Sequence, residues 1–170
     1  MVEEAGQEDA YQIACLHVAS WQGTYTQELS NSFLQHQDLD VRTAEWRRRI
    51  SEGVTVLLVK ERGAVIGFVA CGLVGQDRRD TADWEIFNLH VAPHRHGEGL
   101  GTQLFDASAH LGRSNNARDL ILWVVETNRK ARAFYEHKGM RWDGGEQQRV
   151  LTAKEKLREV RYRMPLAAIR

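Results

Sequence analysis

One glycine-rich segment, residues 88–105, restricts the fold of this chain more than any other part of its sequence. It joins an apolar strand pattern to a helical pattern, and its glycines fall at positions 97, 99 and 101. Glycine lets the backbone bend sharply and lets a ligand approach it closely. The first amides of a helix have no partner inside the helix and, with the helix dipole, favour a phosphate. We therefore expect this loop to bind a phosphate-bearing cofactor.

Two familiar phosphate loops fit this segment poorly. A P-loop ends in Gly-Lys-Ser/Thr, and the chain has no lysine between positions 61 and 129. A dinucleotide-binding loop has glycines at relative positions one, three and six. Position six here is Thr102, and the loop lies mid-chain instead of after a first strand. On this segment alone, an ordinary glycine turn without a ligand stays open as an alternative.

A third pattern fits the segment well. The stretch resembles the pyrophosphate loop of the GNAT acetyltransferases, roughly Arg/Gln-x-x-Gly-x-Gly/Ala, through His96-Gly97-Glu98-Gly99-Leu100-Gly101. It follows Val91-Ala92-Pro93 at the spacing usual in that family, and His96 replaces the usual Arg or Gln. A second family segment, Asn-x-x-Ala-x-x-x-Tyr-Glu-x-x-Gly-Phe, is similar to residues 128–140, where Met140 replaces Phe. Two motifs in the right order are more specific than either alone.

The resemblance implies one GNAT-like domain of the α/β (α+β) class over residues 1–170. This acyl-CoA N-acyltransferase fold has a mixed, mostly antiparallel sheet with helices on both faces. Apolar and β-branched runs independently predict strands at 2–5, 54–59, 64–73, 84–91, 120–126, 141–151 and 157–165. Helical spacing and caps predict helices after Asp9, through most of 27–50, and at 101–112 and 129–138, the last closed by Gly139. The polar stretch 75–81 is expected to be a loop.

The strand that feeds the glycine loop does not alternate cleanly between apolar and polar positions. Ile86 lies on the opposite parity from Leu89 and Val91, and a bulge near Phe87 or Asn88 would repair the phase. The resemblance implies such a bulge, which splays this strand and leaves its backbone available to the pantetheine arm of acetyl-CoA. By the resemblance, the cofactor-binding residues are Leu89, His90, Val91, His96, Gly97, Glu98, Gly99, Leu100, Gly101, Thr102 and Asn128.

Acetyl transfer to an amine needs a neutral amine, a donor to the oxyanion and a proton for the departing thiolate. Tyr135 resembles the general acid of the family, and a phenol with a pKa of about 10 keeps its proton until the thiolate forms. Some members place a Glu where this chain has Trp123, so the base is not carried over. We expect Glu85 to be the base with a raised pKa in its apolar strand, and His90 is the alternative.

The function implied is acetyl-CoA-dependent N-acetyltransfer to a primary amine, by direct attack in a ternary complex. The alternative is a non-catalytic acyl-CoA-binding sensor of the same fold, and a longer acyl-CoA is a further enzymatic alternative. The sequence leaves the acceptor open between small molecules and peptides. By the resemblance, three aromatic residues are candidates for the acceptor wall, and packing in the core is the alternative for each: Trp21, Tyr25 and Phe33.

Composition narrows the remaining classes of protein. The 170-residue chain carries 23 basic and 23 acidic residues, which argues against nucleic acid or an anionic membrane as the main partner. No apolar run approaches the roughly 20 residues of a membrane span, and the acidic start does not read as a signal peptide. Cys15 and Cys71 fit free thiols in a reducing cytoplasm, and histidine spacing predicts no metal site. The fold also allows a homodimer.

Overall fold

The computed structural model of the protein describes residues 1–74 and 82–166, which divide into two compact units. Unit 1 contains residues 1–72 and 88–108, and unit 2 contains the described residues of 73–87 and 109–166. Strand β4 (Asp83–Val91) and helix α4 (Leu100–Ser114) contribute to both units. The loop predicted at 75–81 lies outside the described residues.

The strands form the mixed, mostly antiparallel sheet that the sequence predicted. Their hydrogen-bonded order is β1-β2-β3-β4-β5-β7-β6. Strands β4 and β5 are parallel, whereas β1 with β2, β2 with β3, β5 with β7, and β6 with β7 are antiparallel. The predicted strands are all present among the described residues, with ends that shift by a few positions.

Unit 1 is built on a hairpin of β2 (Thr55–Glu61) and β3 (Ala64–Val74), with β1 (Val2–Glu4) along its edge. The hairpin turn passes through Arg62 and Gly63, whose φ angles are 50° and 81°. Such positive φ angles favour glycine, which explains why a glycine stands in this turn. The central residues of β2 and β3 are buried and apolar.

The N-terminal helices correct two expectations from the sequence. The stretch 27–50 is not mostly continuous helix: it divides into α2 (Asn31–Gln35) and α3 (Leu39–Ser51). The side chains of Ser30 and Asp38 cap these helices by accepting backbone N–H groups, and each cap begins a new helix. Asp9 precedes α1 (Ala10–Thr24), but its carboxylate accepts from Gly6 N and pairs with Lys60 instead of capping the helix.

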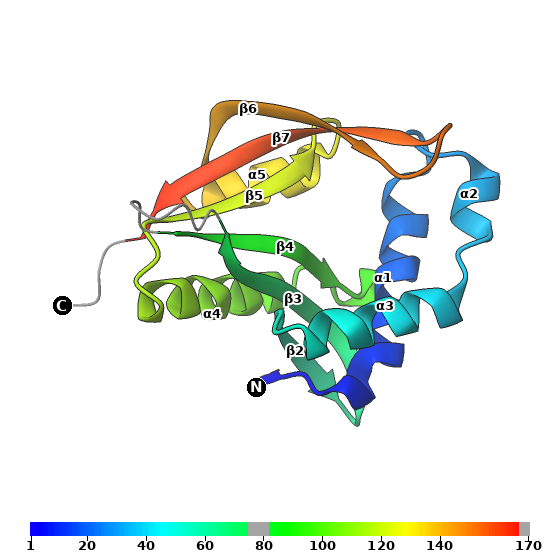
Figure 1. Ribbon diagram of the computed structural model, residues 1–170, viewed down its shortest axis with the longest axis horizontal. Coiled ribbons are helices and arrows are strands. Elements are labelled where there is room, and N and C mark those ends of the chain that lie inside the picture. The colour runs from blue at the N-terminus through cyan, green and yellow to red at the C-terminus, as the bar shows by residue number, and fades with distance from the viewer. Residues whose placement is uncertain (75–81, 167–170) are drawn as a thin grey trace. The chain divides into compact units, whose positions relative to one another are not determined.

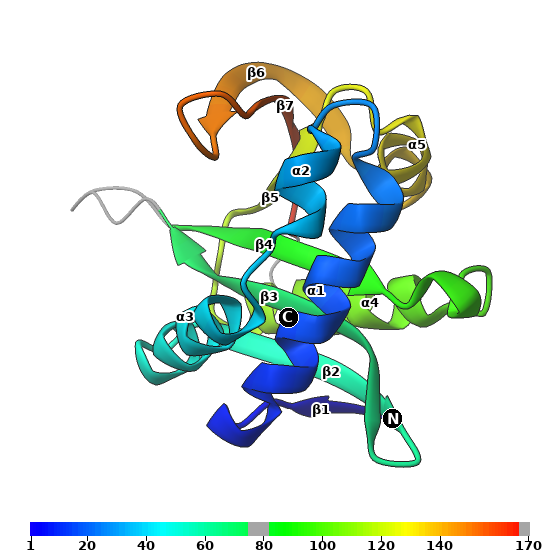
Figure 2. The ribbon, with the colours of Figure 1, turned by 90° about the vertical axis from the view of Figure 1, so that its right-hand side faces the viewer.

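Helices cover both faces of β3 in unit 1. On one face, the rings of His17 in α1 and Trp46 in α3 pack against the Phe68 ring. Their centroids lie 6.2 and 5.2 Å, respectively, from the centroid of Phe68. Figure 2 shows α1 and α3 next to β2 and β3. On the other face, a Cβ atom at Gly67 would lie 3.1 Å from Leu104 of α4. Glycine at position 67 therefore allows α4 to approach the sheet closely.

Unit 2 contains β5 (Asp119–Val125), α5 (Arg129–His137), β6 (Arg141–Val150) and β7 (Lys156–Pro165). Figure 1 shows α5 beside β5 and β7. The register aligns Ile86 with Leu122, and Leu122 with Tyr162, so these side chains share the sheet face that α5 covers. Residues of the opposite parity, including Glu85 and Trp123, point to the other face.

Candidate functional site

The glycine loop has the backbone geometry that its sequence predicted. A short 3-10 turn, η2 (Pro93–Arg95), leads from β4 to the loop, and α4 begins at Leu100. Gly97 and Gly99 have φ angles of 86° and 78°, a conformation in which a side chain would be strained. A Cβ atom at either position would meet nothing within 4 Å. Backbone conformation, and not crowding, therefore requires glycine at these two positions.

The first turn of α4 is anchored in the core by its leucine side chains. Leu100 and Leu104 are 8% and 0% exposed, whereas Thr102 is exposed. A backbone hydrogen bond at the start of the helix runs from Gln103 N to Gly99 O, at 3.0 Å. The amides of Leu100, Gly101 and Thr102 precede it, in the part of a helix where N–H groups have no intrahelical acceptor. These amides can bind an anion.

The charged side chains at the loop largely neutralise one another. Arg95 lies 2.6 Å from Glu61 and 2.7 Å from Glu98. Hydrogen bonds to these carboxylates raise the pKa of Arg95, and the hydrogen bond from Arg95 lowers the pKa of Glu98. One guanidinium thus meets two carboxylates, so this cluster adds no net positive charge to the loop. Anion binding here would depend on the backbone amides.

The side chain of His96, at the first position of the loop motif, contacts the end of β4. Its Nε2 lies 3.0 Å from Val91 O, so the ring donates to this carbonyl in the tautomer protonated at Nε2. The next amide, Ala92 N, donates to Ile66 O of β3. A carbonyl oxygen has two lone pairs, so Val91 O can accept a second hydrogen bond. The imidazole of His96 therefore links the glycine loop to the last residue of β4.

Side chains along β4 change phase between its two ends. Trp84 lies against Gly112 of α4, because a Cβ atom at Gly112 would be 2.8 Å from the indole. Val91 is separated from Trp84 by an odd number of positions. Its side chain lies beside Gly67, on the face of β3 that Leu104 of α4 also contacts. Strict alternation would place these two positions on opposite faces. The phase change agrees with the bulge predicted near Phe87 or Asn88.

The central part of β4 contacts the N-terminal helices. Asn88 Oδ1 accepts a hydrogen bond from Arg49 of α3 at 3.0 Å. The ring of His90 lies 4.9 Å from that of His17 in α1 and 5.4 Å from that of Phe68. His90 is half-buried and therefore projects into an aromatic cluster.

The second predicted motif forms the start of α5. Asn128 is the N-cap residue, and its Oδ1 accepts the Ala131 N–H at 3.1 Å. The sequence predicted a role for Asn128 only in cofactor binding, although asparagine before a helix is also a strong capping signal. Because the carbonyl oxygen is engaged in the cap, the amide Nδ2 is the atom that can donate to a ligand. Tyr135 follows on the same helix and is 8% exposed.

Glu85 occupies a position where its carboxylate is poorly solvated. Burial is the largest cause that raises its pKa to about 7, and repulsion from Glu159 adds to this, whereas Arg161 opposes it. Glu159 is 5% exposed and accepts from Gln147 at 2.8 Å. Arg161 lies over the Trp123 ring, 5.6 Å from its centroid. The sequence predicted the raised pKa of Glu85 but not the neighbours on β7.

The three aromatic residues expected in the acceptor wall lie together in unit 1. The ring centroid of Trp21 is 5.5 Å from that of Tyr25 and 6.4 Å from that of Phe33. Trp21 is buried, and Tyr25 and Phe33 are half-buried. The cluster can present an apolar surface, while Trp21 itself belongs to the core.

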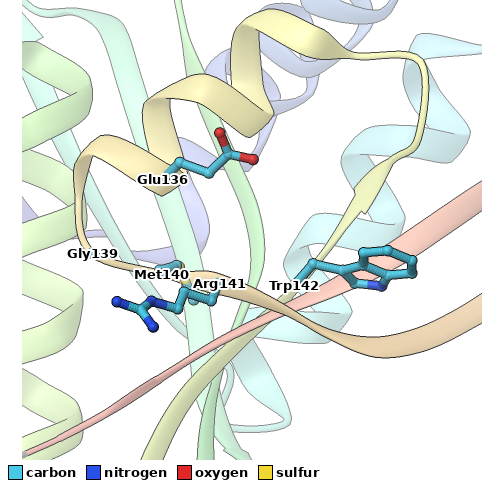
Figure 3. A pocket seen from close by; sticks show the side chains of 5 residues that line it. All are labelled: Glu136, Gly139, Met140, Arg141 and Trp142. Atoms are coloured by element: carbon cyan, nitrogen blue, oxygen red, sulfur yellow. The ribbon is translucent and has the colours of Figure 1, made fainter.

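A depression of about 390 Å³ lies at the end of α5, and none of the predicted site residues lines it. It is lined by Glu136, Gly139, Met140, Arg141 and Trp142 (Figure 3). Among the described residues, no group of three or more His, Cys, Asp or Glu side chains could hold a metal ion. None of the helices in residues 1–74 and 82–166 is long and apolar enough to cross a membrane.

The predicted site residues thus fall into two groups. Unit 1 holds Leu89, His90, Val91 and the loop from His96 to Thr102. Unit 2 holds Glu85, Asn128 and Tyr135. The sequence missed Arg95 with Glu61, and also Glu159, because these contacts join segments far apart in the chain.

Comparison with known proteins identifies the family. Residues 16–140 match the model of the acetyltransferase (GNAT) family, and the chain belongs to that family. YuaI of Bacillus subtilis (strain 168), named an uncharacterized N-acetyltransferase, is 28% identical over 127 residues, which cover 75% of this chain and 72% of YuaI. The probable N-acetyltransferase Rv2775 of Mycobacterium tuberculosis (strain ATCC 25618 / H37Rv) is 28% identical over 139 residues, which cover 80% of this chain and 76% of the relative.

A solved structure supports the same fold. The structure of yncA from Salmonella typhimurium, solved with its cofactor acetyl-CoA, has a TM-score of 0.70 and 19% identity to this chain, and covers 100% of this chain and 95% of its own. The family and fold predicted from the sequence are therefore confirmed. Membership in this family agrees with acetyl-CoA as the predicted cosubstrate and with acetyl transfer as the general reaction.

Proposed function

We propose that this protein transfers the acetyl group of acetyl-CoA to a primary amine, by direct attack of the amine within a ternary complex. The observation that carries the proposal is the glycine loop. Gly97 and Gly99 adopt left-handed conformations directly before the first turn of α4, within the residues that match the acetyltransferase family. Backbone amides of a helix N-terminus suit a pyrophosphate. The acceptor is a small-molecule or peptide amine.

The cofactor would be held mainly by backbone groups. The pyrophosphate would accept hydrogen bonds from amides in the segment His96–Thr102. Leu89, His90 and Val91 would pair with the pantetheine arm through main-chain groups, as an added strand pairs with a sheet edge. The phase change along β4 supports this role, because a bulge interrupts regular pairing. Asn128 Nδ2 would donate to the cofactor while Oδ1 caps α5.

The reaction would use one acid and one base. Tyr135 would donate its phenolic proton to the departing thiolate, since a phenol is protonated at neutral pH. Glu85, with a pKa of about 7, would take the proton of the attacking amine directly or through a water molecule. A pKa near the working pH suits a general base. The backbone of β4 would stabilise the oxyanion, and His90 is the alternative base.

A panel of primary amines tests the proposal directly. Purified protein with saturating acetyl-CoA should release free thiol steadily when the correct amine is present, and mass spectrometry should find that amine acetylated. A rate that rises with amine concentration supports enzymatic transfer. Tight acetyl-CoA binding without amine-dependent thiol release, across small amines and peptide N-termini, would favour the sensor alternative.

A further inference from the structure

One buried tyrosine on β7 links α5 to the sheet by its hydroxyl group. Tyr162 is 1% exposed, and its hydroxyl donates to Glu136 Oε1 at 2.6 Å. The hydroxyl oxygen of Tyr162 also accepts a hydrogen bond from Arg132 Nε at 3.1 Å. Burial, followed by the hydrogen bond to Glu136, raises the pKa of Tyr162. The hydroxyl therefore keeps its proton at neutral pH and holds both side chains.

Arg132 extends this link to the end of β5. Its Nη1 donates to Glu126 O at 3.0 Å, one residue after the strand ends. The amide of Glu126 in turn donates to Arg158 O of β7 at 2.9 Å. Helix α5 is thus tied to β5 and β7 through one guanidinium, that of Arg132 near its start, and one phenol that meets Glu136 near its end.

The two helix residues that meet Tyr162 fix the rotation of α5 about its axis. Positions 132 and 136 are one turn apart and lie on the same side of the helix. Tyr135 immediately precedes Glu136, so its side chain leaves the helix about 100° around the axis from this anchored side. Glu136 Oε1 meets the phenol, while the residue also lines the open depression at the helix end (Figure 3). Any rotation of α5 would move Tyr135.

We infer that Tyr162 is a positioning residue that aims Tyr135 through Glu136 and Arg132. The inference rests on the proposed function, in which Tyr135 is the general acid. Displacing a catalytic group by about 1 Å can cost roughly 100-fold in rate. Removal of the Tyr162 hydroxyl should therefore lower kcat about 10- to 100-fold and leave the KM for acetyl-CoA within about threefold.

A double-mutant cycle separates this role from a purely structural one. The kcat of Tyr162→Phe is measured in the wild-type background and in the Tyr135→Phe background. If Tyr162 acts through Tyr135, the second background should show less than about a threefold further loss, since coupled residues are not additive. Equal losses in both backgrounds would overturn the inference. A wild-type kcat in Tyr162→Phe would also overturn it.

Two variants serve as controls for the cycle. Glu136→Gln keeps an acceptor oxygen for the phenol and should retain turnover, whereas Glu136→Ala should resemble Tyr162→Phe. Leu157→Val, a core change in β7 at a residue that is 2% exposed, should lower stability without changing kcat. If Tyr135→Phe itself keeps full turnover, the proposed acid is wrong and this inference falls with it. If the wild type transfers acetyl and Tyr135→Phe is slower but still measurable, the cycle decides the role of Tyr162.

Discussion

The N-termini of α4 and α5 differ in how their first backbone amides can find hydrogen-bond acceptors. Each helix begins with amides that lack intrahelical acceptors. At α5, the side chain of Asn128 accepts the Ala131 N–H and closes the helix end. At α4, the residue before the helix is Gly99, which has no side chain with which to cap. One helix end is closed by a side chain of its own segment, while we propose that the other leaves its amides available to a ligand.

This difference predicts how each motif responds to substitution. The start of α4 depends on backbone conformation, so it should tolerate changes of exposed side chains and resist any change at Gly97 or Gly99. The helix α5 depends on particular atoms of Asn128, Tyr135 and Glu136, so conservative changes should have specific effects.

Glu85→Gln should cause the largest loss of turnover while both helix ends stay intact. General base catalysis contributes about 100- to 10,000-fold, so kcat at pH 7 should fall by at least about 100-fold. The wild-type rate should rise with pH through about 7, where Glu85 loses its proton, and the variant should lack that limb. A pH–rate profile and acetyl-CoA titrations check both parts. An unchanged profile would remove Glu85 from the mechanism.

The Glu85 carboxylate should also make the stability of the folded protein depend on pH. Burial raises the pKa of Glu85 to about 7, so between pH 4.5 and 7 the folded protein holds a proton that the unfolded chain has lost. The contribution of Glu85 to stability therefore falls as pH rises through this window. Thermal unfolding should show Glu85→Gln gaining stability relative to wild type from pH 5 to pH 8. A constant difference would contradict the raised pKa.

Tyr135→Phe tests the side-chain character of α5. Loss of the phenol should reduce kcat about 100-fold, at the lower end of the range for an acid, because a thiolate is already a good leaving group. The affinity for acetyl-CoA should stay within about threefold, since the aromatic ring still packs in the core. Steady-state kinetics and equilibrium binding measure the two effects. Unchanged turnover would mean that this tyrosine only packs.

Gly99→Ala tests the backbone character of the α4 loop. A Cβ atom at a φ of 78° costs about 1–2 kcal/mol, and relaxation of the loop should weaken acetyl-CoA binding about tenfold. The matched control is Gly23→Ala in α1, which is exposed and has no Cβ contact within 4 Å. That variant should keep full affinity. Equal affinity in both variants would show that the loop geometry does not serve the cofactor.

Asn128 allows its two roles to be separated by paired variants. Asn128→Ala removes the cap and should cost about 1 kcal/mol of stability, together with acetyl-CoA affinity. Asn128→Asp keeps the capping oxygen but loses the Nδ2 donor, so stability should be retained while affinity falls severalfold. Denaturant unfolding and binding titrations compare the two variants. Full acetyl-CoA affinity in Asn128→Asp would assign this residue to the cap alone.

Glu98→Gln should give the smallest effect and act in the opposite direction. The change removes one of the two carboxylates around Arg95 and leaves the loop backbone unaltered. Less negative charge beside a helix N-terminus should strengthen anion binding by a few tenths to about 1 kcal/mol, a severalfold gain that fades at high salt. A weaker complex would show that the Glu98 carboxylate itself contributes to binding.

The same contrast explains which features could be predicted from the sequence. The glycine loop was predictable because φ preferences are local, so Gly97 and Gly99 reveal the turn without tertiary information. The raised pKa of Glu85 was predictable because a carboxyl group in an apolar strand loses solvation. The contacts of Arg95 with Glu61 and of Tyr162 with α5 were not predictable, because each joins segments more than 25 residues apart. The division of 27–50 into two helices was missed because side-chain caps at Ser30 and Asp38 outweighed the apolar spacing.

Thermal unfolding with acetyl-CoA, and with NAD as the control, tests the central claim most directly. The claim is that the open helix end at α4 binds the pyrophosphate of acetyl-CoA through its backbone. At about 100 times the dissociation constant, binding should add about 2.7 kcal/mol of stability, so Tm should rise clearly with acetyl-CoA and stay constant with NAD. No shift with acetyl-CoA, or a shift with NAD alone, would contradict the account.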